Sequence, residues 1–454
     1  MAIFRGKLES HYMTPLKAEA LEHIPGEKGL PFVGSTLKIV ADPIAFANES
    51  HKKYGAVFRN YSFGGWNVTL LGPEANELVL FDRDKLFSSE QGWGPVLNQL
   101  FPRGLMLIDF EEHRGHRKAL SVAFKPEPMR HYAAALNAGI APRVKSWGNT
   151  SFKFYPAIKQ LTLDLAASSF LGVALGPEAT KINRAFVDMV AASIGVVRAP
   201  LPGTLMAKGV KGRQFMLDFF AREIPKRRAH GGSDMFSQLC TAHDDDGVAL
   251  SDQDIMDHLN FLMMAAHDTL TSSITSMVYM LAKNPEWQAR LRAEHEALGV
   301  NDDELPFGVL GDLPLTECAF KESLRLMAPV PSIPRRAMRD FEFGGYHIPA
   351  GTWVSIDPIF THRMAEYWPD PTHFDPLRFT PEASAGRHKY AWVPFGGGAH
   401  MCLGLHFAYM QTKIFFFHLL RHHEIVLDPS ATEQWRIFPI PKPKDGLPVS
   451  VKTL

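Results

Sequence analysis

The stretch Phe395-Gly396-Gly397-Gly398-Ala399-His400-Met401-Cys402-Leu403-Gly404 decides the fold of this 454-residue chain. Its three consecutive glycines allow the backbone to turn tightly and to approach a flat ligand closely. An apolar helical pattern follows, carried by Phe407, Met410, Ile414 and Phe417. Cys402 therefore lies just before a helix, where unpaired backbone N–H groups stabilise a thiolate, which is a good soft ligand for iron. Taken alone, an isolated cysteine is more often a small buried apolar residue.

The surrounding pattern is far more specific than the cysteine. The stretch resembles the haem-binding loop of the cytochrome P-450 family, in which Phe, Gly, Cys and Gly recur at the spacing of Phe395, Gly398, Cys402 and Gly404. The resemblance implies that Cys402 is the axial ligand of the iron of haem b (iron protoporphyrin IX), where a thiolate favours O–O cleavage. It further implies that Phe395 packs beside the sulfur, that His400 reaches a haem propionate and that Gly404 belongs to the haem-binding loop.

Composition and charge narrow the class of protein. Lys plus Arg and Asp plus Glu are both 48, so the net charge gives no indication of a nucleic-acid partner. Three scattered cysteines suit neither a disulfide framework nor a zinc or iron–sulfur site, and a reducing cytosol is the simplest compartment. The N-terminus has no apolar signal-peptide core, and no run of about 18 apolar residues predicts a spanning helix. We expect a soluble cytoplasmic monomer without a transmembrane anchor.

Strand-like and helical patterns divide the chain. Two glycine-centred hairpins are predicted, 56–71 around Gly64-Gly65 and 340–348 around Gly344-Gly345, and a further strand at 352–356. We expect a mainly α protein with a smaller β-rich region (α+β), formed as one domain over 1–454. The β-rich part comprises about 25–80, 330–360 and the C-terminal strands, and the helical part about 85–330 and 402–425. The resemblance implies a triangular prism with a long central helix over the haem.

The central helix is predicted between the capping-box-like Ser251-Asp252-Gln253-Asp254 and the stop at Asn284-Pro285. Its middle, Ala265-Ala266-His267-Asp268-Thr269, resembles the oxygen-activation motif of the family, with Ala266 at the usual glycine position. The resemblance assigns Thr269 to hydrogen bonding with the bound oxygen or its water, and Asp268 to proton delivery. The alternative is that Thr269 bonds back to its own helix and Asp268 pairs with a distant cation.

Two further stretches resemble segments that bind haem carboxylates. In 109–117 the resemblance selects His113 and Arg117, and in Pro334-Arg335-Arg336-Ala337 it selects Arg335. Arginine suits this role because its planar guanidinium matches a carboxylate bidentately. With His400, these would be four cations for two carboxylates, so one assignment can fail, and any one could be ordinary surface charge.

A third motif has a structural role. Glu322 and Arg325 are one helical turn apart and share a helix face. By resemblance they pair with Arg378 and hold the haem-loop side of the fold together. A surface ion pair of little energetic value is the alternative.

The implied reaction is insertion of one atom of O2 into a small lipophilic substrate of the terpenoid, steroid, retinoid or fatty acid class. The resemblance implies that the pocket is lined by 93–107, 262–266 and 330–333 and closed by 200–205 and 435–439. These segments are mostly apolar, which suits a lipophilic ligand. Electrons should come from a separate ferredoxin and ferredoxin reductase, docking near Cys402. The docking face is predicted to include Lys118, Lys125, Arg387 and Lys389.

Three alternative functions compete with this one. A haem-binding carrier or sensor without turnover has no need of the Asp268–Thr269 pair. A peroxide-driven peroxygenase typically replaces this acid–alcohol pair, which is present here. A zinc or thiol hydrolase built on Cys402 would make the other motifs coincidences.

Overall fold

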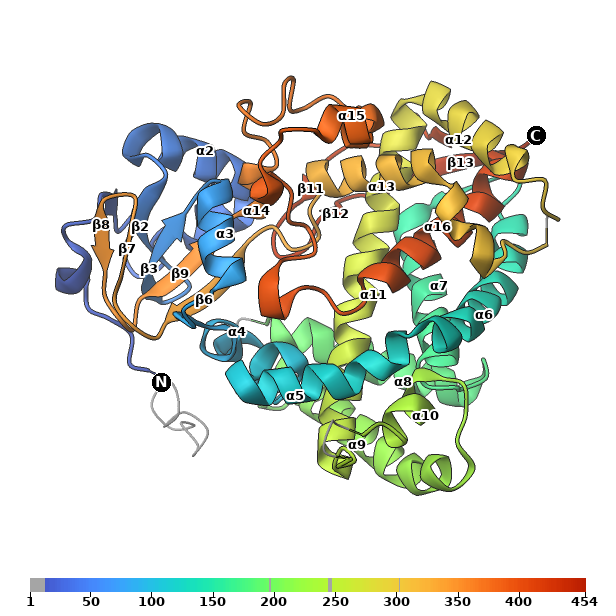
Figure 1. Ribbon diagram of the computed structural model, residues 1–454, viewed down its shortest axis with the longest axis horizontal. Helices are drawn as coiled ribbons and strands as arrows, with labels where there is room; N and C mark the ends of the chain where they lie inside the picture. Colours follow the sequence, from blue (N-terminus) through green and yellow to red (C-terminus); the bar gives the residue numbers. More distant parts are fainter. Residues whose placement is uncertain (1–12, 196, 244–246, 302) are drawn as a thin grey trace.

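The computed structural model describes residues 13–195, 197–243, 247–301 and 303–454. Figure 1 shows the sheet-rich part on one side and the helices on the other, with one long helix running between them. The α-helices are α1 (Thr36–Ala41), α2 (Pro43–Tyr54), α3 (Pro73–Phe81), α4 (Ser89–Leu97), α5 (Phe110–Ser121), α6 (Pro126–Lys145), α7 (Phe154–Ser169), α8 (Pro177–Ser193), α9 (Leu205–His230), α10 (Met235–Cys240), α11 (Asp252–Lys283), α12 (Pro285–Ala297), α13 (Pro314–Leu326), α14 (Pro358–Thr361), α15 (Pro381–Ser384) and α16 (Leu405–His422).

The main sheet joins strands from both ends of the described chain. Its order is β1-β2-β3-β9-β6-β4, and a second sheet has the order β10-β13-β5. The strands are β1 (Gly26–Glu27), β2 (Val57–Ser62), β3 (Gly65–Leu70), β4 (Phe87–Ser88), β5 (Thr150–Lys153), β6 (Ile333–Ala337), β7 (Phe341–Phe343), β8 (Tyr346–Ile348), β9 (Trp353–Ile356), β10 (His423–Leu427), β11 (Trp435–Arg436), β12 (Lys442–Pro443) and β13 (Pro448–Thr453).

Both predicted hairpins are present. β2 and β3 pair antiparallel from Val57↔Leu70 to Ser62↔Gly65, and β7 pairs with β8 from Phe341↔Ile348 to Phe343↔Tyr346. At the second turn Gly344 and Gly345 both have positive φ, which glycine adopts without strain. The mainly helical fold with a smaller sheet region is therefore confirmed. β5 is a difference, because it lies within the segment predicted to be helical and joins the C-terminal strands β10 and β13.

The central helix is α11, and its predicted bounds are confirmed. The Ser251 side chain accepts a hydrogen bond from the backbone N–H of Asp254 at the start, and Asn284 follows its last residue, Lys283. Its 32 residues extend about 48 Å at about 1.5 Å per residue. Most of its side chains are buried against the neighbouring helices, as its apolar sequence predicts. No helix in the described part of the chain is both long and apolar enough to cross a membrane.

Candidate active site

The glycine-rich loop places Cys402 at the start of α16. Gly398 has φ 59°, and a Cβ at this position would lie 2.0 Å from the carbonyl oxygen of Leu80 in α3. Glycine is therefore required by both conformation and space. The backbone N–H of Cys402 donates to the carbonyl oxygen of Phe395 at 2.9 Å, which closes the loop. The Phe395 ring packs against Tyr409 of α16, with ring centroids 5.6 Å apart.

The Cys402 thiol combines accessibility with a water-poor surrounding. Its side chain is exposed, yet burial within the protein raises its pKa, against the lowering effects of the Gly404 N–H and the Arg117 charge. The two observations agree if the sulfur faces a space that the protein largely encloses. Gly404 and Arg117 both favour the thiolate, which is the form that binds a metal ion.

Four predicted carboxylate-binding side chains converge beside this loop. The rings of His113 and His400 lie 3.9 Å apart by their centroids, and His400 Nε2 lies 3.5 Å from an oxygen of Asp109. Burial, together with the charges of His400 and Arg117, lowers the pKa of His113 to about 3. The structure therefore brings together His113, Arg117, Arg335 and His400, which lie in segments far apart in the sequence.

Some of the polar atoms at this cluster have no protein partner. His113 Nε2 is buried without a hydrogen bond. Arg335 is 5% exposed, and burial lowers its pKa to about 10. Within the described residues its guanidinium donates only to the carbonyl oxygen of Pro334, at 2.9 Å, and has no carboxylate within ion-pair distance. Buried donors and charges without partners are costly, so the cluster fits a ligand that carries carboxylates, as haem does.

Asp109 is a member of the site that sequence reasoning missed. It receives hydrogen bonds from the Ser88 hydroxyl, from the Ser89 N–H at 2.9 Å and from the Glu90 N–H at 3.3 Å. Burial would raise its pKa, but His400 and these donors outweigh burial and lower it. An aspartate before a helix usually signals a helix cap, and Asp109 makes no side-chain cap bond to α5. Only the fold reveals that it connects α4 to His400.

A histidine pair holds α5, the helix that carries His113 and Arg117. The first half of α5 is mostly exposed, with His113 its main buried residue. His116, one turn further along, has Nδ1 at 2.7 Å from Nε2 of the fully buried His258 in α11. This contact holds α5 against the central helix α11 and so fixes the position of His113 and Arg117. Nothing in the local sequence around His116 indicates it.

The contacts of Thr269 and Asp268 in the middle of α11 are those of the alternative, a bond back to the helix and a pairing with a distant cation. Both ring nitrogens of His267 are buried without a hydrogen bond. The Thr269 hydroxyl donates to the carbonyl oxygen of Ala265 at 2.7 Å, and its oxygen can still accept a hydrogen bond. An oxygen of Asp268 lies 3.0 Å from His267 Nδ1 and 3.4 Å from Lys159 Nζ. Burial would raise the pKa of Asp268, but His267 and Lys159 outweigh burial and lower it to about 2. Lys159, on α7, is a partner that the sequence did not reveal.

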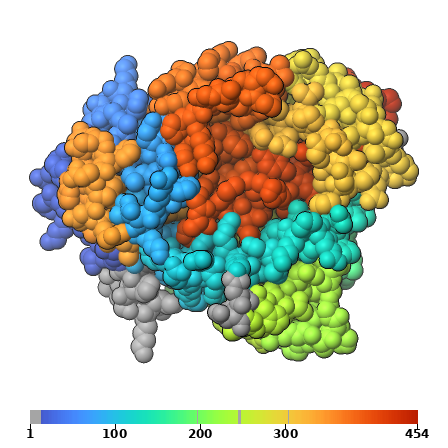
Figure 2. All heavy atoms as spheres, viewed as in Figure 1, coloured from blue at the N-terminus to red at the C-terminus, as the bar shows by residue number. Residues whose placement is uncertain are grey.

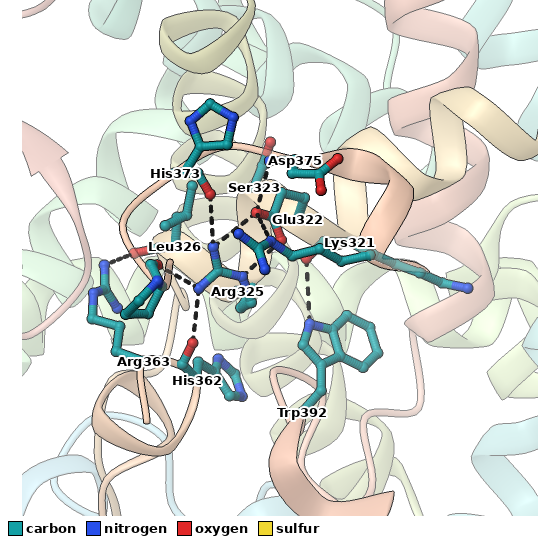
Figure 3. A network of polar contacts seen from close by, with 12 residues as sticks. Lys321, Glu322, Ser323, Arg325, Leu326, His362, Arg363, His373, Asp375 and Trp392 are labelled. Carbon is teal, nitrogen blue, oxygen red and sulfur yellow. Dashed lines mark hydrogen bonds and ion pairs between the residues drawn. The ribbon is translucent and has the colours of Figure 1, made fainter. Parts of the chain in front are cut away.

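The third predicted motif forms a buried ion pair (Figure 3). Arg325 donates through Nε and Nη2 to the two oxygens of Glu322, at 2.7 and 2.8 Å, and both side chains are fully buried. Arg378 Nε lies 3.4 Å from the same carboxylate, as predicted. The indole N–H of Trp392, close to the glycine-rich loop, donates to the carbonyl oxygen of Lys321 at 3.3 Å. The hydrogen bond from Trp392 connects α13, which carries the ion pair, to the segment that leads to Cys402.

The sequence profile of the cytochrome P450 family matches residues 24–444. The chain belongs to the cytochrome P450 family. Putative cytochrome P450 136 of Mycobacterium tuberculosis is 37% identical over 452 residues, covering 98% of this chain and 91% of the relative. Putative cytochrome P450 120 of Synechocystis is 30% identical over 449 residues, covering 97% and 99% of the two chains. The structure of a retinoic acid-bound cyanobacterial P450, CYP120A1, matches with a TM-score of 0.86 and 30% identity, covering 95% of this chain and 99% of the other.

Family membership defines the class of reaction. This P450 is an oxidoreductase of the monooxygenase type, with a haem-thiolate cofactor, a lipophilic substrate and O2. The residues present fit that cofactor, because an accessible thiol lies near a buried His113 nitrogen without a hydrogen bond and a buried Arg335 without a carboxylate partner among the described residues.

Proposed function

We propose that this P450 binds haem b through Cys402 and inserts one atom of O2 into a terpenoid, steroid, retinoid or fatty acid. Electrons are delivered by a ferredoxin and its reductase, and the protein acts as a one-domain cytoplasmic monomer. The observation that carries the proposal is the accessible Cys402 thiol near His113, whose Nε2 makes no hydrogen bond, and near Arg335, which has no carboxylate partner among the described residues.

Each residue of the cluster has a distinct task. Cys402 would bind the iron through its thiolate, and Arg117 favours that negative charge. His113, Arg117, Arg335 and His400 hold the haem carboxylates, with Asp109 orienting His400. When bound, the haem supplies O2 activation and oxygen transfer, which are reactions of the cofactor itself. Phe395 shields the sulfur from water, and Gly404 supplies an N–H that favours the thiolate.

Asp268 and Thr269, on the central helix α11, transfer protons on the side of the pocket opposite Cys402. His267 and Lys159 hold Asp268 as a carboxylate and lower its pKa to about 2, so it accepts a proton and passes it on only when these contacts change. Thr269 donates to Ala265 and can accept from a water molecule at the same time. These two residues are the proposed catalytic residues.

Replacing Thr269 by alanine is expected to divert electrons into hydrogen peroxide. The variant should bind haem and substrate normally, because the Thr269 side chain bonds only to its own helix among the described residues. The yield of product per electron pair should fall by about tenfold or more, since a positioned proton-transfer group contributes factors of about 10²–10⁴. Simultaneous measurement of NADH, product and peroxide checks this. Unchanged coupling would remove Thr269 from the mechanism, and Ser273→Ala is the matched control, because its hydroxyl bonds back to Thr269 O in the same way.

The proposed pocket walls are apolar. Leu97 is 6% exposed, Leu100 and Phe101 are fully buried, and Ile333 and Ile437 are 8% and 9% exposed. Such walls favour lipophilic ligands over polar ones. The similar cyanobacterial structure is bound to retinoic acid, which supports a ligand of this size and polarity. Titrating the holoprotein with a panel of lipophilic compounds while recording the Soret band tests the substrate class, and turnover with a ferredoxin system and O2 tests the reaction.

The ferredoxin is proposed to dock on the face shown in Figure 2, which is recessed around the orange-red segment that contains the glycine-rich loop and α16. Lys118, Lys125 and Lys389 are exposed, as a docking face requires. Arg387 differs from the prediction, because it is half-buried, stacks on Trp368 at 4.1 Å and donates to the carbonyl oxygen of Arg378. Its guanidinium serves the fold, and the three lysines remain as proposed contacts.

Reversing the charges of Lys118, Lys125 and Lys389 to glutamate is expected to slow ferredoxin-supported reduction by about tenfold or more at low salt. Charge complementarity mainly raises the association rate, and added salt screens it. Stopped-flow reduction at several ionic strengths checks the effect. A wild-type rate and salt dependence in the triple variant would place the docking face elsewhere. Reversal of the exposed Lys452, on β13, is the control.

A further inference from the structure

A small cavity lies where α7, α11 and α16 meet, beside the segment of α11 that carries Asp268. Its volume is about 10 Å³, which is room for about one water molecule. Three polar side chains line it, one from each helix: Thr162 of α7, His267 of α11 and Gln411 of α16. Each of these residues is 3% exposed or less. The cavity is therefore a partly polar space in the interior of the protein.

The rest of the cavity wall is apolar. Phe170 and Phe407 line it with their ring centroids 5.0 Å apart, together with Leu270 and two alanines, Ala166 and Ala266. Such a wall offers no hydrogen bond to a polar group. The polar side chains must therefore find partners elsewhere in the protein or in a bound molecule, because a buried polar group without a partner is costly.

Two of the three polar side chains have no such partner in the protein. Both ring nitrogens of His267 are buried without a hydrogen bond. The side-chain amide of Gln411 makes no hydrogen bond with any described residue, although it offers two donors and an acceptor. The Thr162 hydroxyl donates to the carbonyl oxygen of Lys159 at 3.1 Å and accepts from the Thr271 hydroxyl at 2.7 Å, so one lone pair remains. A buried water molecule typically makes about three hydrogen bonds to groups of this kind.

His267 also faces the proposed catalytic acid. Its Nδ1 lies 3.0 Å from Oδ1 of Asp268, and Nζ of Lys159 lies 3.4 Å from the same oxygen. A neutral imidazole carries its proton on one nitrogen, and the hydrogen bond that the other nitrogen makes decides which one. A donor bonded to Nε2 places the proton on Nδ1, where it attracts the carboxylate. The opposite tautomer would present a lone pair to the carboxylate and repel it.

We propose that the cavity binds one water molecule, which donates to His267 Nε2 and to Thr162 Oγ1 and accepts a hydrogen bond from the Gln411 amide. Through this water, His267 and Gln411 are positioning residues for Asp268. The water also connects α16, which begins just after Cys402, to the helix that carries the proposed catalytic pair. The inference rests on the proposed function, since it assumes that Asp268 delivers protons.

A high-resolution crystal structure of the holoprotein tests the water site directly. The expected result is an ordered water molecule within about 3.2 Å of the Gln411 amide and of His267 Nε2. Gln411→Met removes the amide but keeps the length of the side chain, so the water should be absent from this variant. A wild-type structure without an ordered water in the cavity overturns the inference.

The coupling of turnover tests the role of the water. In Gln411→Met the yield of product per electron pair should fall by about threefold to tenfold, the range that corresponds to the loss of one net hydrogen bond. Substrate affinity and the spectrum of the reduced carbon monoxide complex should match the wild type, which a general loss of packing would not allow. His267→Phe should lower the yield at least as much. The double variant should couple no worse than His267→Phe alone, because both residues act through one water.

Thr412→Val is the matched control. Thr412 is the next residue on α16, and its fully buried hydroxyl also has no hydrogen-bond partner among the described residues, but it does not line the cavity. This variant should couple like the wild type. Wild-type coupling in Gln411→Met, when Thr269→Ala is uncoupled, overturns the inference and leaves the proposed function standing. Wild-type coupling in both variants overturns the inference and also contradicts the proposed catalytic role of Thr269.

Discussion

Replacing Cys402 by serine is expected to abolish monooxygenase activity while haem remains bound. The hydroxyl of serine stays protonated at neutral pH and is a poor ligand for haem iron compared with a thiolate. The side chains proposed to hold the haem carboxylates, His113, Arg117, Arg335 and His400, are unchanged in the variant. Haem content should therefore fall far less than turnover. Haem stoichiometry, the spectrum of the reduced carbon monoxide complex and product formation are the measurements.

The other two cysteines provide the control. Cys240 and Cys318 are 4% and 7% exposed, and burial raises the pKa of both thiols. Neither lies in the glycine-rich loop, so serine at either position should leave the spectrum and turnover intact, with a modest loss of stability. Retention of turnover by Cys402→Ser, or its loss in Cys318→Ser, would contradict the assignment of the ligand.

Replacing Arg325 by alanine is expected to lower the free energy of unfolding by about 3–5 kcal/mol, the typical cost of breaking one side of a buried ion pair. Arg325 donates to Glu322 and to the carbonyl oxygens of His362, Pro371 and His373. The variant leaves a fully buried Glu322 charge with Arg378 as its remaining cation, at 3.4 Å. Urea unfolding and the yield of holoprotein measure the effect.

An exposed arginine gives the matched comparison. Arg114 lies 3.7 Å from Glu111, and the two side chains are 83% and 70% exposed. Its replacement by alanine should change the free energy of unfolding by about 0–1 kcal/mol. Arg325→Lys keeps the charge but loses the planar fork, so its stability should lie between those of the wild type and Arg325→Ala. Equal stability of Arg114→Ala and Arg325→Ala would contradict a bracing role.

Local patterns predicted the parts of the fold that short stretches of sequence determine. The glycine pairs at Gly64-Gly65 and Gly344-Gly345 lie in the two observed hairpins, and Ser251 caps α11 as predicted. The spacing of Glu322 and Arg325 also indicated their ion pair, because residues one turn apart share a helix face. In each case the interacting groups are neighbours in the sequence.

Contacts between distant segments could not be predicted in this way. β5 lies in a helical region and forms a strand only because β13 pairs with it, from Pro448↔Lys153 to Val451↔Thr150. Lys159 joins Asp268, and His116 joins His258, through the packing of separate helices against α11. Arg387 was predicted at the surface, yet Trp368 provides a ring for it to stack on. Each of these pairings depends on the complete tertiary structure.

The spectrum of the reduced carbon monoxide complex of the wild-type holoprotein tests the central claim most directly. The account predicts the red-shifted Soret band of a thiolate-ligated haem, because Cys402 is the proposed ligand and Arg117 and the Gly404 N–H favour its charge. The same band should be absent from Cys402→Ser. A band in the position of histidine-ligated haem, or no haem spectrum after reconstitution, would contradict the account.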